Sequence, residues 1–137
     1  MGINLIKETK ATAQAKTGFT QYQTVITSGK HSIVVDEPES AKGTDTAIDP
    51  LSLLAASLAS CTSITLRMYI DRKMWVVSEI TVDAEVFKIE GGTLIERRIH
   101  FKGELNEEQR KRLVQIADAC PIHKILVGDI MIDTKLV

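Results

Sequence analysis

Two cysteines, Cys61 and Cys120, are the side chains of this sequence best suited to covalent chemistry. A cysteine reacts as its thiolate, so its surroundings must lower the pKa of the thiol. Cys120 directly precedes Pro121 at an expected helix start, where free backbone amides and the helix dipole favour a thiolate, and His123 lies in the next turn. Cys61 lies in an apolar stretch, where the alternative is a small hydrophobic residue packed in a core. The pattern leaves two interpretations open, a redox pair and two inert buried thiols.

A metal site is a third way to use two cysteines. Tetrahedral zinc sites usually take four nitrogen or sulfur ligands in closely spaced pairs, whereas these cysteines lie 59 residues apart and neither belongs to a Cys-x-x-Cys motif. A set that adds His123 and a distant His31 or His100 is conceivable, but the spacing does not support it. We therefore expect neither a metal nor an organic cofactor.

The composition is that of one soluble globular domain over residues 1–137. Seventeen Lys and Arg balance eighteen Asp and Glu, and aromatic residues make up only 4%, so we expect no nucleic-acid partner. The N-terminal apolar run is too short for a secretory signal. The uncharged stretch from Pro50 to Leu66 falls short of the roughly 20 apolar residues that span a bilayer. We expect a cytoplasmic protein without membrane contact, in a compartment that keeps thiols reduced.

Three strands and a loop are expected before the first cysteine. The residues before Asp36 are rich in Thr, Val and Ile, which favours strands near residues 10–16, 20–27 and 31–36. Residues 37–49 are mostly small or polar and include Pro38 and Gly43. We expect them to form a surface loop, and loops of this length are often functional.

A long helix over residues 50–73 is expected to carry Cys61. Asp49 can cap its free amides, and Pro50 suits the first helical position. Leu58 and Cys61 share one apolar stripe at helical spacing, and further apolar residues widen the stripe almost all round. A helix without a polar face belongs at the centre of a fold.

The second half of the chain predicts a hairpin. Residues 80–86 alternate between apolar and polar side chains, and a second strand follows Gly91-Gly92. Arg97 lies on the apolar side of that second strand.

Two helices and a last strand are expected after the hairpin. Asn106 and Gln109 form a capping-box signal for a helix that ends near Ala119. A short helical turn from Pro121 to Leu126 should follow, ended by Gly128. The last residues alternate as a strand, with one face made by Ile130, Ile132, Thr134 and Leu136.

The segments around the two cysteines resemble the OsmC/Ohr family of osmotically inducible and organic hydroperoxide resistance proteins. The resemblance is carried by the run 43–46, by the stretch from Asp49 to Thr62 and by the Cys-Pro turn in 119–124. It implies an α+β OsmC-like fold made by an intertwined homodimer, with two long central helices wrapped by antiparallel sheets.

The resemblance also implies a reaction. Cys61 would attack an organic hydroperoxide or hydrogen peroxide as the thiolate and become a sulfenic acid, which Cys120 would resolve to a disulfide. An external dithiol would regenerate both thiols. The resemblance thus implies a thiol-dependent peroxidase with Cys61 and Cys120 as its catalytic residues. It also implies three partners: a second copy of the chain, a small hydroperoxide and a dithiol reductant.

The sequence departs from the family at two activating positions. The best-characterised members carry an Arg in the N-terminal strands and a Glu after the helix-opening Pro, whereas here no Arg precedes Arg67 and Leu51 follows Pro50. Arg67, Arg97, Asp45 and Asp49 are candidate substitutes, each more simply explained as a structural ion pair or cap. The alternative function is a non-enzymatic redox-sensing or small-ligand-binding protein that uses the cavity at the dimer interface.

Overall fold

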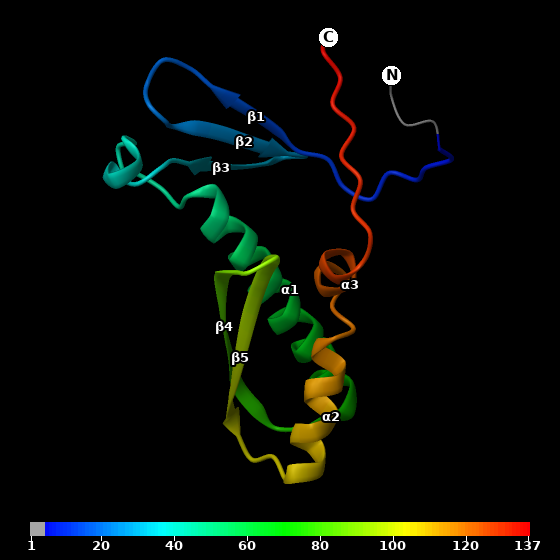
Figure 1. Cartoon of the computed structure of the whole chain (residues 1–137). Coiled ribbons are helices and arrows are strands. Elements are labelled where there is room, and N and C mark those ends of the chain that lie inside the picture. Colours follow the sequence, from blue (N-terminus) through cyan, green and yellow to red (C-terminus); the bar gives the residue numbers. More distant parts are fainter. Residues whose placement is uncertain (1–4) are drawn as a thin grey trace. The chain divides into compact units, whose positions relative to one another are not determined.

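The computed structural model describes residues 5–137 and has the expected mixed α and β content, with antiparallel sheets and one long helix (Figure 1). Its chain contacts divide it into two compact units. The first contains the residues up to Leu53 together with Met131–Val137, and the second contains Leu54–Ile130. The expectation of a single domain over residues 1–137 stays a prediction.

The first unit holds a three-stranded antiparallel sheet in the order β1-β2-β3. The strands are β1 (Gln14–Thr17), β2 (Thr24–Ser28) and β3 (His31–Val35). Ser28 pairs with His31, so two residues connect β2 and β3, and Gly29 takes the positive φ of 59° that such tight hairpin turns favour. All three strands were predicted, but the first two begin later than expected because pairing in the ladder starts only at Gln14 and Thr24.

A buried carboxylate, Asp36, organises the loop that follows β3. It accepts hydrogen bonds from the backbone amides of Tyr22 at 2.9 Å, Glu37 at 2.7 Å and Thr46 at 3.1 Å, and from the Thr44 and Thr46 hydroxyls. These bonds, with those of the Thr44 hydroxyl first, hold the Asp36 pKa far below its ordinary value. The loop contains one turn of 3-10 helix, η1 (Glu39–Ala41).

Helix α1 (Pro50–Lys73) has the predicted bounds. Asp49 accepts a hydrogen bond from the backbone amide of Ser52 at 3.1 Å and so caps the helix as expected. Met74 ends it in the left-handed conformation, with φ of 57°, and the Trp75 amide bonds back to the Ile70 carbonyl at 3.1 Å. Among the described residues, α1 is the one helix long and apolar enough to cross a membrane, a test that core helices of soluble proteins also pass.

The second unit continues with a hairpin and two helices. Strands β4 (Val77–Ile89) and β5 (Gly92–Gly103) pair antiparallel and are longer than predicted. Helix α2 (Glu107–Ala117) begins with the predicted capping box, in which Asn106 and Gln109 bond reciprocally at 2.8 and 2.9 Å. The short helix α3 (Pro121–Val127) follows after three residues.

The core of the second unit joins α1 to the hairpin and to α2. Leu66 and Ile70 of α1 and Leu113 of α2 have no exposed surface. The other buried members of this cluster are Tyr69, Val77, Phe101 and Ala117. This packing holds the end of α2, and therefore the start of α3, beside the middle of α1.

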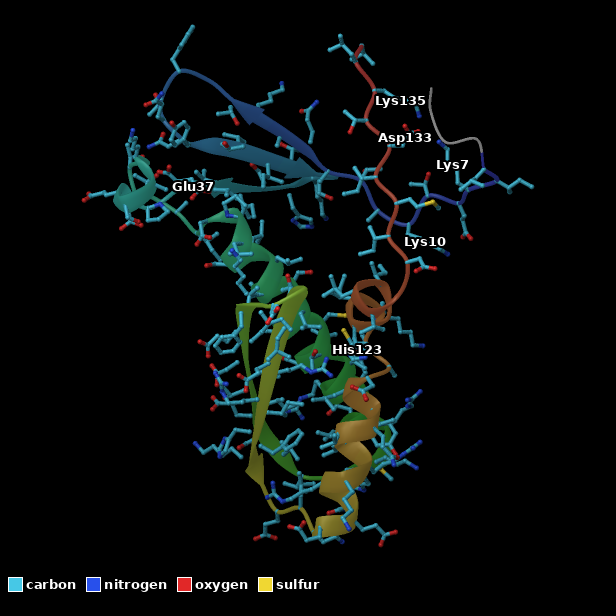
Figure 2. The ribbon with its side chains drawn as sticks, viewed as in Figure 1. Lys7, Lys10, Glu37, His123, Asp133 and Lys135 are labelled. Carbon is cyan, nitrogen blue, oxygen red and sulfur yellow. The ribbon has the colours of Figure 1, made fainter. Side chains whose placement is uncertain are left out.

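The prediction of a last strand is wrong. Residues 129–137 form no helix or strand. A strand needs a neighbour to receive its backbone hydrogen bonds, and no described strand of the chain pairs with this segment. The segment therefore has the alternating pattern of a strand but no backbone pairing with another described strand. Asp133 and Lys135 within it form an ion pair at 3.2 Å (Figure 2).

Candidate functional site

The structure brings Cys61 and Cys120 together although they are 59 residues apart. Cys61 lies in the middle of α1, and Cys120 is the N-cap residue of α3. The two thiols are free and lie close enough for each to shift the pKa of the other. Core packing explains why the two cysteines are close. Ala117 belongs to the same buried cluster as Leu66, which lies shortly after Cys61 on α1. Only Asp118 and Ala119 separate Ala117 from Cys120.

Cys120 is surrounded by hydrogen-bond donors. Its Sγ atom accepts a bond from the backbone amide of His123 at 3.4 Å, as an N-cap side chain does. Burial is complete and opposes ionisation, but the bonds from the Cys61 thiol, the His123 amide and the Thr62 hydroxyl prevail. They hold the pKa of Cys120 below its ordinary value.

Cys61 has the opposite electrostatics. It is partly exposed, and burial together with its hydrogen bond to Cys120 raises the pKa of its thiol. The amide of Ile122 and the hydroxyl of Thr65 act against this rise without cancelling it. In the resting pair the thiolate is thus favoured on Cys120, at the N-terminus of α3, and the expectation that Cys61 attacks as the thiolate stays a prediction.

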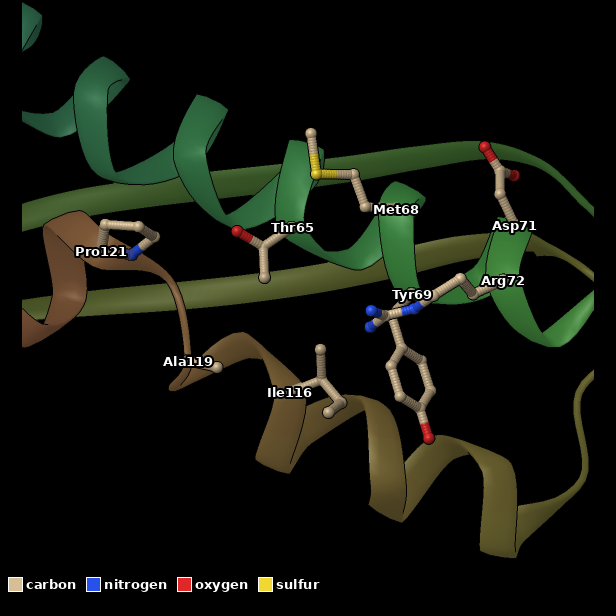
Figure 3. Close-up of a pocket in the computed structure, with 8 residues that line it drawn as sticks. All are labelled: Thr65, Met68, Tyr69, Asp71, Arg72, Ile116, Ala119 and Pro121. Atoms are coloured by element: carbon tan, nitrogen blue, oxygen red, sulfur yellow. The ribbon is translucent and has the colours of Figure 1, made fainter.

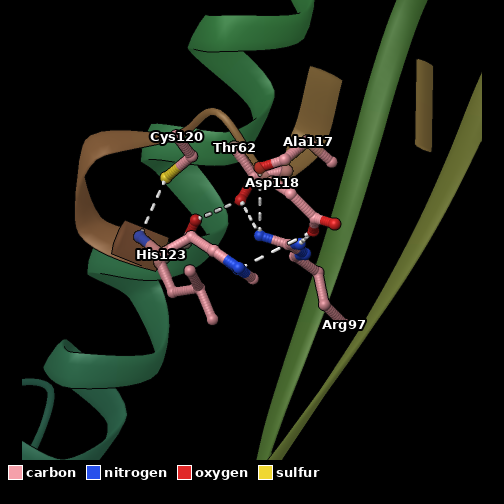
Figure 4. A network of polar contacts seen from close by, with 7 residues as sticks. Thr62, Arg97, Ala117, Asp118, Cys120 and His123 are labelled. Carbon is pink, nitrogen blue, oxygen red and sulfur yellow. Dashed lines mark hydrogen bonds and ion pairs between the residues drawn. The ribbon is translucent and has the colours of Figure 1, made fainter. Parts of the chain in front are cut away.

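A polar network adjoins the buried cysteine (Figure 4). The guanidinium of Arg97 donates to the Thr62 hydroxyl at 3.0 Å, to the Asp118 carboxylate at 2.8 Å and to the Ala117 carbonyl at 3.4 Å. The Arg97 side chain is only 13% exposed, whereas Asp118 is 61% exposed. Arg97 points inward, as its place on the apolar side of β5 indicated. It is also paired with Asp118, which agrees with the simpler explanation of Arg97 as part of a structural ion pair.

Two of the other candidate substitutes, Arg67 and Asp49, have structural roles. Arg67 donates to the Val77 carbonyl at 2.8 Å and pairs with Asp71 at 3.3 Å, so it braces the end of α1 against β4. Asp49 caps α1. The His123 side chain lies on α3 with its Nδ1 atom 3.8 Å from the Asp118 carboxylate (Figure 4).

Sequence reasoning missed Thr62 and Asp118. Thr62 is a fully buried polar residue on the buried stripe of α1, between Leu58 and Leu66. That one polar member in an apolar stripe, next to a cysteine, was a usable signal. The sequence around Asp118 contains no such signal, because its partner Arg97 lies 21 residues earlier on a strand and the pair forms only in the folded chain.

A pocket of about 730 Å³ adjoins the cysteine pair (Figure 3). Thr65, which bonds to Cys61, and Ala119 and Pro121, which flank Cys120, lie at one end of its lining. The rest of the lining is a mixture of apolar and charged side chains: Met68, Tyr69, Asp71, Arg72 and Ile116. Neither thiol is itself among the lining side chains, although their neighbours at this end of the pocket are.

Nothing in the described part of the chain forms a metal-binding cluster, since no three His, Cys, Asp or Glu side chains gather closely enough. The chemistry that this arrangement can perform is that of the thiol pair. One thiol is reachable, the other is buried and favoured as a thiolate, and the two are in contact.

Comparison with protein families identifies one match, to the model described as OsmC-like protein, over residues 43–135. This range contains both cysteines, α1, the hairpin and both following helices. A search of curated proteins returned no match.

Solved structures share the fold. An OsmC-like protein from Mycoplasma pneumoniae is 20% identical, with a TM-score of 0.76 over 89% of this chain and 90% of that one. An organic hydroperoxide resistance protein OsmC from Legionella pneumophila is 22% identical, with a TM-score of 0.63 over 90% and 93%. A Vibrio cholerae protein, described as an organic hydroperoxide resistance protein with captopril in one of its active sites, is 22% identical, with a TM-score of 0.63 over 94% and 92%.

Proposed function

Because the chain belongs to the OsmC-like protein family, we propose that it is a thiol-dependent peroxidase that reduces organic hydroperoxides or hydrogen peroxide with Cys61 and Cys120. Structures of the same fold include proteins described as organic hydroperoxide resistance proteins. The observation that carries the proposal is the contact between two free thiols from distant parts of the chain, beside a pocket large enough for a small organic molecule.

The difference in exposure favours Cys61 for the first attack in our proposal. Cys120 has no exposed surface, whereas Cys61 is partly exposed and touches the pocket residue Thr65. The charge, however, is favoured on Cys120. In our proposal the Cys120 thiolate therefore serves as the base for the neighbouring Cys61.

The first step makes a sulfenic acid. Cys120 takes the proton of Cys61 while the Cys61 sulfur attacks the terminal oxygen of the hydroperoxide and the O–O bond breaks. The proton then passes from Cys120 to the leaving alkoxide, which departs as an alcohol. Cys61 is left as a sulfenic acid and Cys120 as a thiolate.

The second step makes the disulfide. The Cys120 thiolate attacks the sulfenic sulfur of Cys61, the S–O bond breaks, and the hydroxide that leaves takes up a proton from solvent to become water. An external dithiol then reduces the disulfide by two exchange reactions and is itself oxidised to a disulfide. We place the protein in the cytoplasm, where such reductants keep thiols reduced.

A homodimer is part of this proposal. One face of α1 is apolar and exposed in the single chain, with Ile64 54% and Met68 65% exposed. A second copy packed against this face would cover it, which accounts for a helix without a polar side.

Steady-state reduction of cumene or tert-butyl hydroperoxide with a dithiol donor tests the proposed function. We expect turnover by the wild-type protein and none by Cys61→Ser, whereas Cys120→Ser should consume at most one hydroperoxide per thiol before it stalls. Normal turnover by Cys61→Ser would contradict the proposal. Absent turnover by the wild type, with both thiols unchanged, would instead favour the ligand-binding alternative.

A further inference from the structure

We infer that a second pocket of this unit binds a small organic phosphate. The pocket has a volume of about 390 Å³ and lies between the end of α1 and the start of α2. Tyr69 lines it as well as the pocket beside the cysteines, and its ring extends from α1 toward α2 (Figure 3). Neither cysteine lines it, so the site is separate from the proposed peroxidase chemistry.

The pocket carries an excess of positive charge. Its charged lining residues are three cations, Lys73, Lys111 and Arg112, and one carboxylate, Glu108, which leaves a net of two positive charges. None of the three cations forms an ion pair with a described carboxylate, whereas both arginines of β5 do. Unpaired cations gathered at one pocket repel one another, and a bound anion relieves that repulsion. The charge therefore favours an anionic ligand.

The neutral polar side chains of the pocket offer mainly hydrogen-bond donors. The side-chain oxygens of Asn106 and Gln109 accept from backbone amides in the capping box. The side-chain oxygen of Gln115 accepts from Nη1 of Arg112 at 3.0 Å. An amide side chain whose oxygen is engaged still has its NH2 group to donate. A ligand rich in acceptor oxygens matches this set of groups.

Arg112 is oriented by its neighbours in a way that leaves part of its guanidinium free. Its Nε atom donates to the Tyr69 hydroxyl at 3.1 Å, and its Nη1 atom donates to Gln115. Its Nη2 atom has no hydrogen-bond partner among the described residues. A guanidinium held in this way presents N–H groups in a fixed geometry that suits phosphate oxygens.

Lys73 lies on the same aromatic ring as Arg112. Its Nζ atom is 5.6 Å from the Tyr69 ring centroid, and the Cζ atom of Arg112 is 5.7 Å from it. Contact with the ring face holds both cations beside the pocket. A single anion can therefore contact a charge from α1 and a charge from α2.

A phosphate monoester matches the pocket better than a carboxylate does. It carries a charge of about −1.5 to −2 near neutral pH and three strong acceptor oxygens, which suits two net positive charges and several donors. Tyr69 and Trp75 meet edge to face with 5.6 Å between their ring centroids. These two rings give the organic part of the ligand an aromatic wall to pack against.

Trp75 is the one tryptophan of the sequence, so its fluorescence reports directly on this pocket. Phenyl phosphate titrated into the full chain should change the Trp75 fluorescence saturably. Added salt should weaken the binding, because the attraction is between charges near the surface. Benzoate, which has the same ring and a single charge, should bind less tightly, and neutral benzyl alcohol should not compete.

Two substitutions and a matched control locate the binding. Arg112→Gln should weaken the binding of phenyl phosphate about tenfold or more, the usual loss for a charge-assisted hydrogen bond. Lys73→Gln should weaken it as well. Arg110→Gln removes the same charge from α2 at a position that does not line the pocket, and it should change the affinity by less than about twofold.

The Lys73 variant keeps the test decisive if Arg112→Gln fails to fold. The Lys73 side chain contacts the Tyr69 ring but forms no hydrogen bond or ion pair with the described residues, so its loss should spare the fold. An unchanged Trp75 signal up to about 10 mM phenyl phosphate would overturn the inference. Equal affinities for Arg110→Gln and the two pocket variants would also overturn it.

Binding of benzoate as tight as that of phenyl phosphate would overturn the assignment to a phosphate. None of these measurements uses a hydroperoxide or a thiol. The phosphate site and the proposed peroxidase function can therefore fail separately.

Discussion

Replacing Cys120 by Ser should slow the first chemical step, because the proposed mechanism uses the Cys120 thiolate to deprotonate Cys61. Ser is a good N-cap residue, so α3 should keep its capping bond. If Cys61 instead ionised by itself, removal of Cys120 would leave the formation of its sulfenic acid unaffected.

The size of the effect follows from the pKa of Cys61. Burial raises that pKa above the ordinary value of a thiol. A thiol with a pKa at or above about 8.5 carries at most about 3% thiolate near pH 7. Loss of a positioned base typically costs about 10²- to 10⁴-fold in rate. We therefore expect Cys120→Ser to form the Cys61 sulfenic acid at least about tenfold more slowly than the wild type near pH 7.

Rapid mixing with one equivalent of cumene hydroperoxide, followed by trapping of the sulfenic acid with dimedone, measures this step. The wild-type rate should fall as pH is lowered through the depressed pKa of Cys120, because protonation removes the base. The rate of Cys120→Ser should instead rise with pH up to the raised pKa of Cys61. Formation of the sulfenic acid in Cys120→Ser at the wild-type rate and with the wild-type pH profile would refute the assignment of Cys120 as the base.

Three further predictions concern the elements that position the site. Leu113→Ala should lower the free energy of unfolding by about 2–5 kcal/mol in a denaturant titration, because Leu113 has no exposed surface; the exposed Val114→Ala is its control, and equal losses would contradict the core assignment. Met74→Gly should raise the free energy of unfolding by up to about 1 kcal/mol, since Met74 is 85% exposed and has positive φ; a loss of stability would show that its side chain contributes. Asp36→Asn should lower the free energy of unfolding at neutral pH, because a carboxyl whose pKa is depressed by folding stabilises the folded state above its unfolded pKa. The loss of stability relative to the wild type should shrink as the pH falls below about 4, where the wild-type carboxylate loses its contribution. A loss of stability that does not change with pH would contradict this prediction.

The helices and the hairpin could be predicted because their signals are local. Asp49 and Pro50 mark the start of α1, and the capping box of Asn106 and Gln109 marks the start of α2. The prediction of a last strand failed because alternation indicates only which side chains would share a face. It does not indicate whether a neighbouring strand is available for pairing. The true lengths of β4 and β5 also depended on pairing between strands, which continues beyond the alternating residues.

The candidate site was predictable in its residue types and less so in its electrostatics. The spacing of the cysteines did not require them to meet, and the family resemblance supplied that expectation. The donors at Cys120 were partly foreseeable from the Cys-Pro helix start, but its bond to Thr62 depends on packing between α1 and α3. The inward position of Arg97 was visible in the pattern of β5, whereas its partners come from α1 and from the residues at the end of α2.

The contact between the two thiols is the central claim, and intact-mass measurement with peptide mapping tests it most directly. The wild-type protein is treated with one equivalent of hydroperoxide, the remaining thiols are blocked, and the sample is digested without reductant. We expect the loss of two hydrogens per chain and a single cross-linked peptide that joins Cys61 to Cys120. Unchanged thiols, or a Cys61 oxidised beyond the sulfenic acid while Cys120 stays free, would contradict the account.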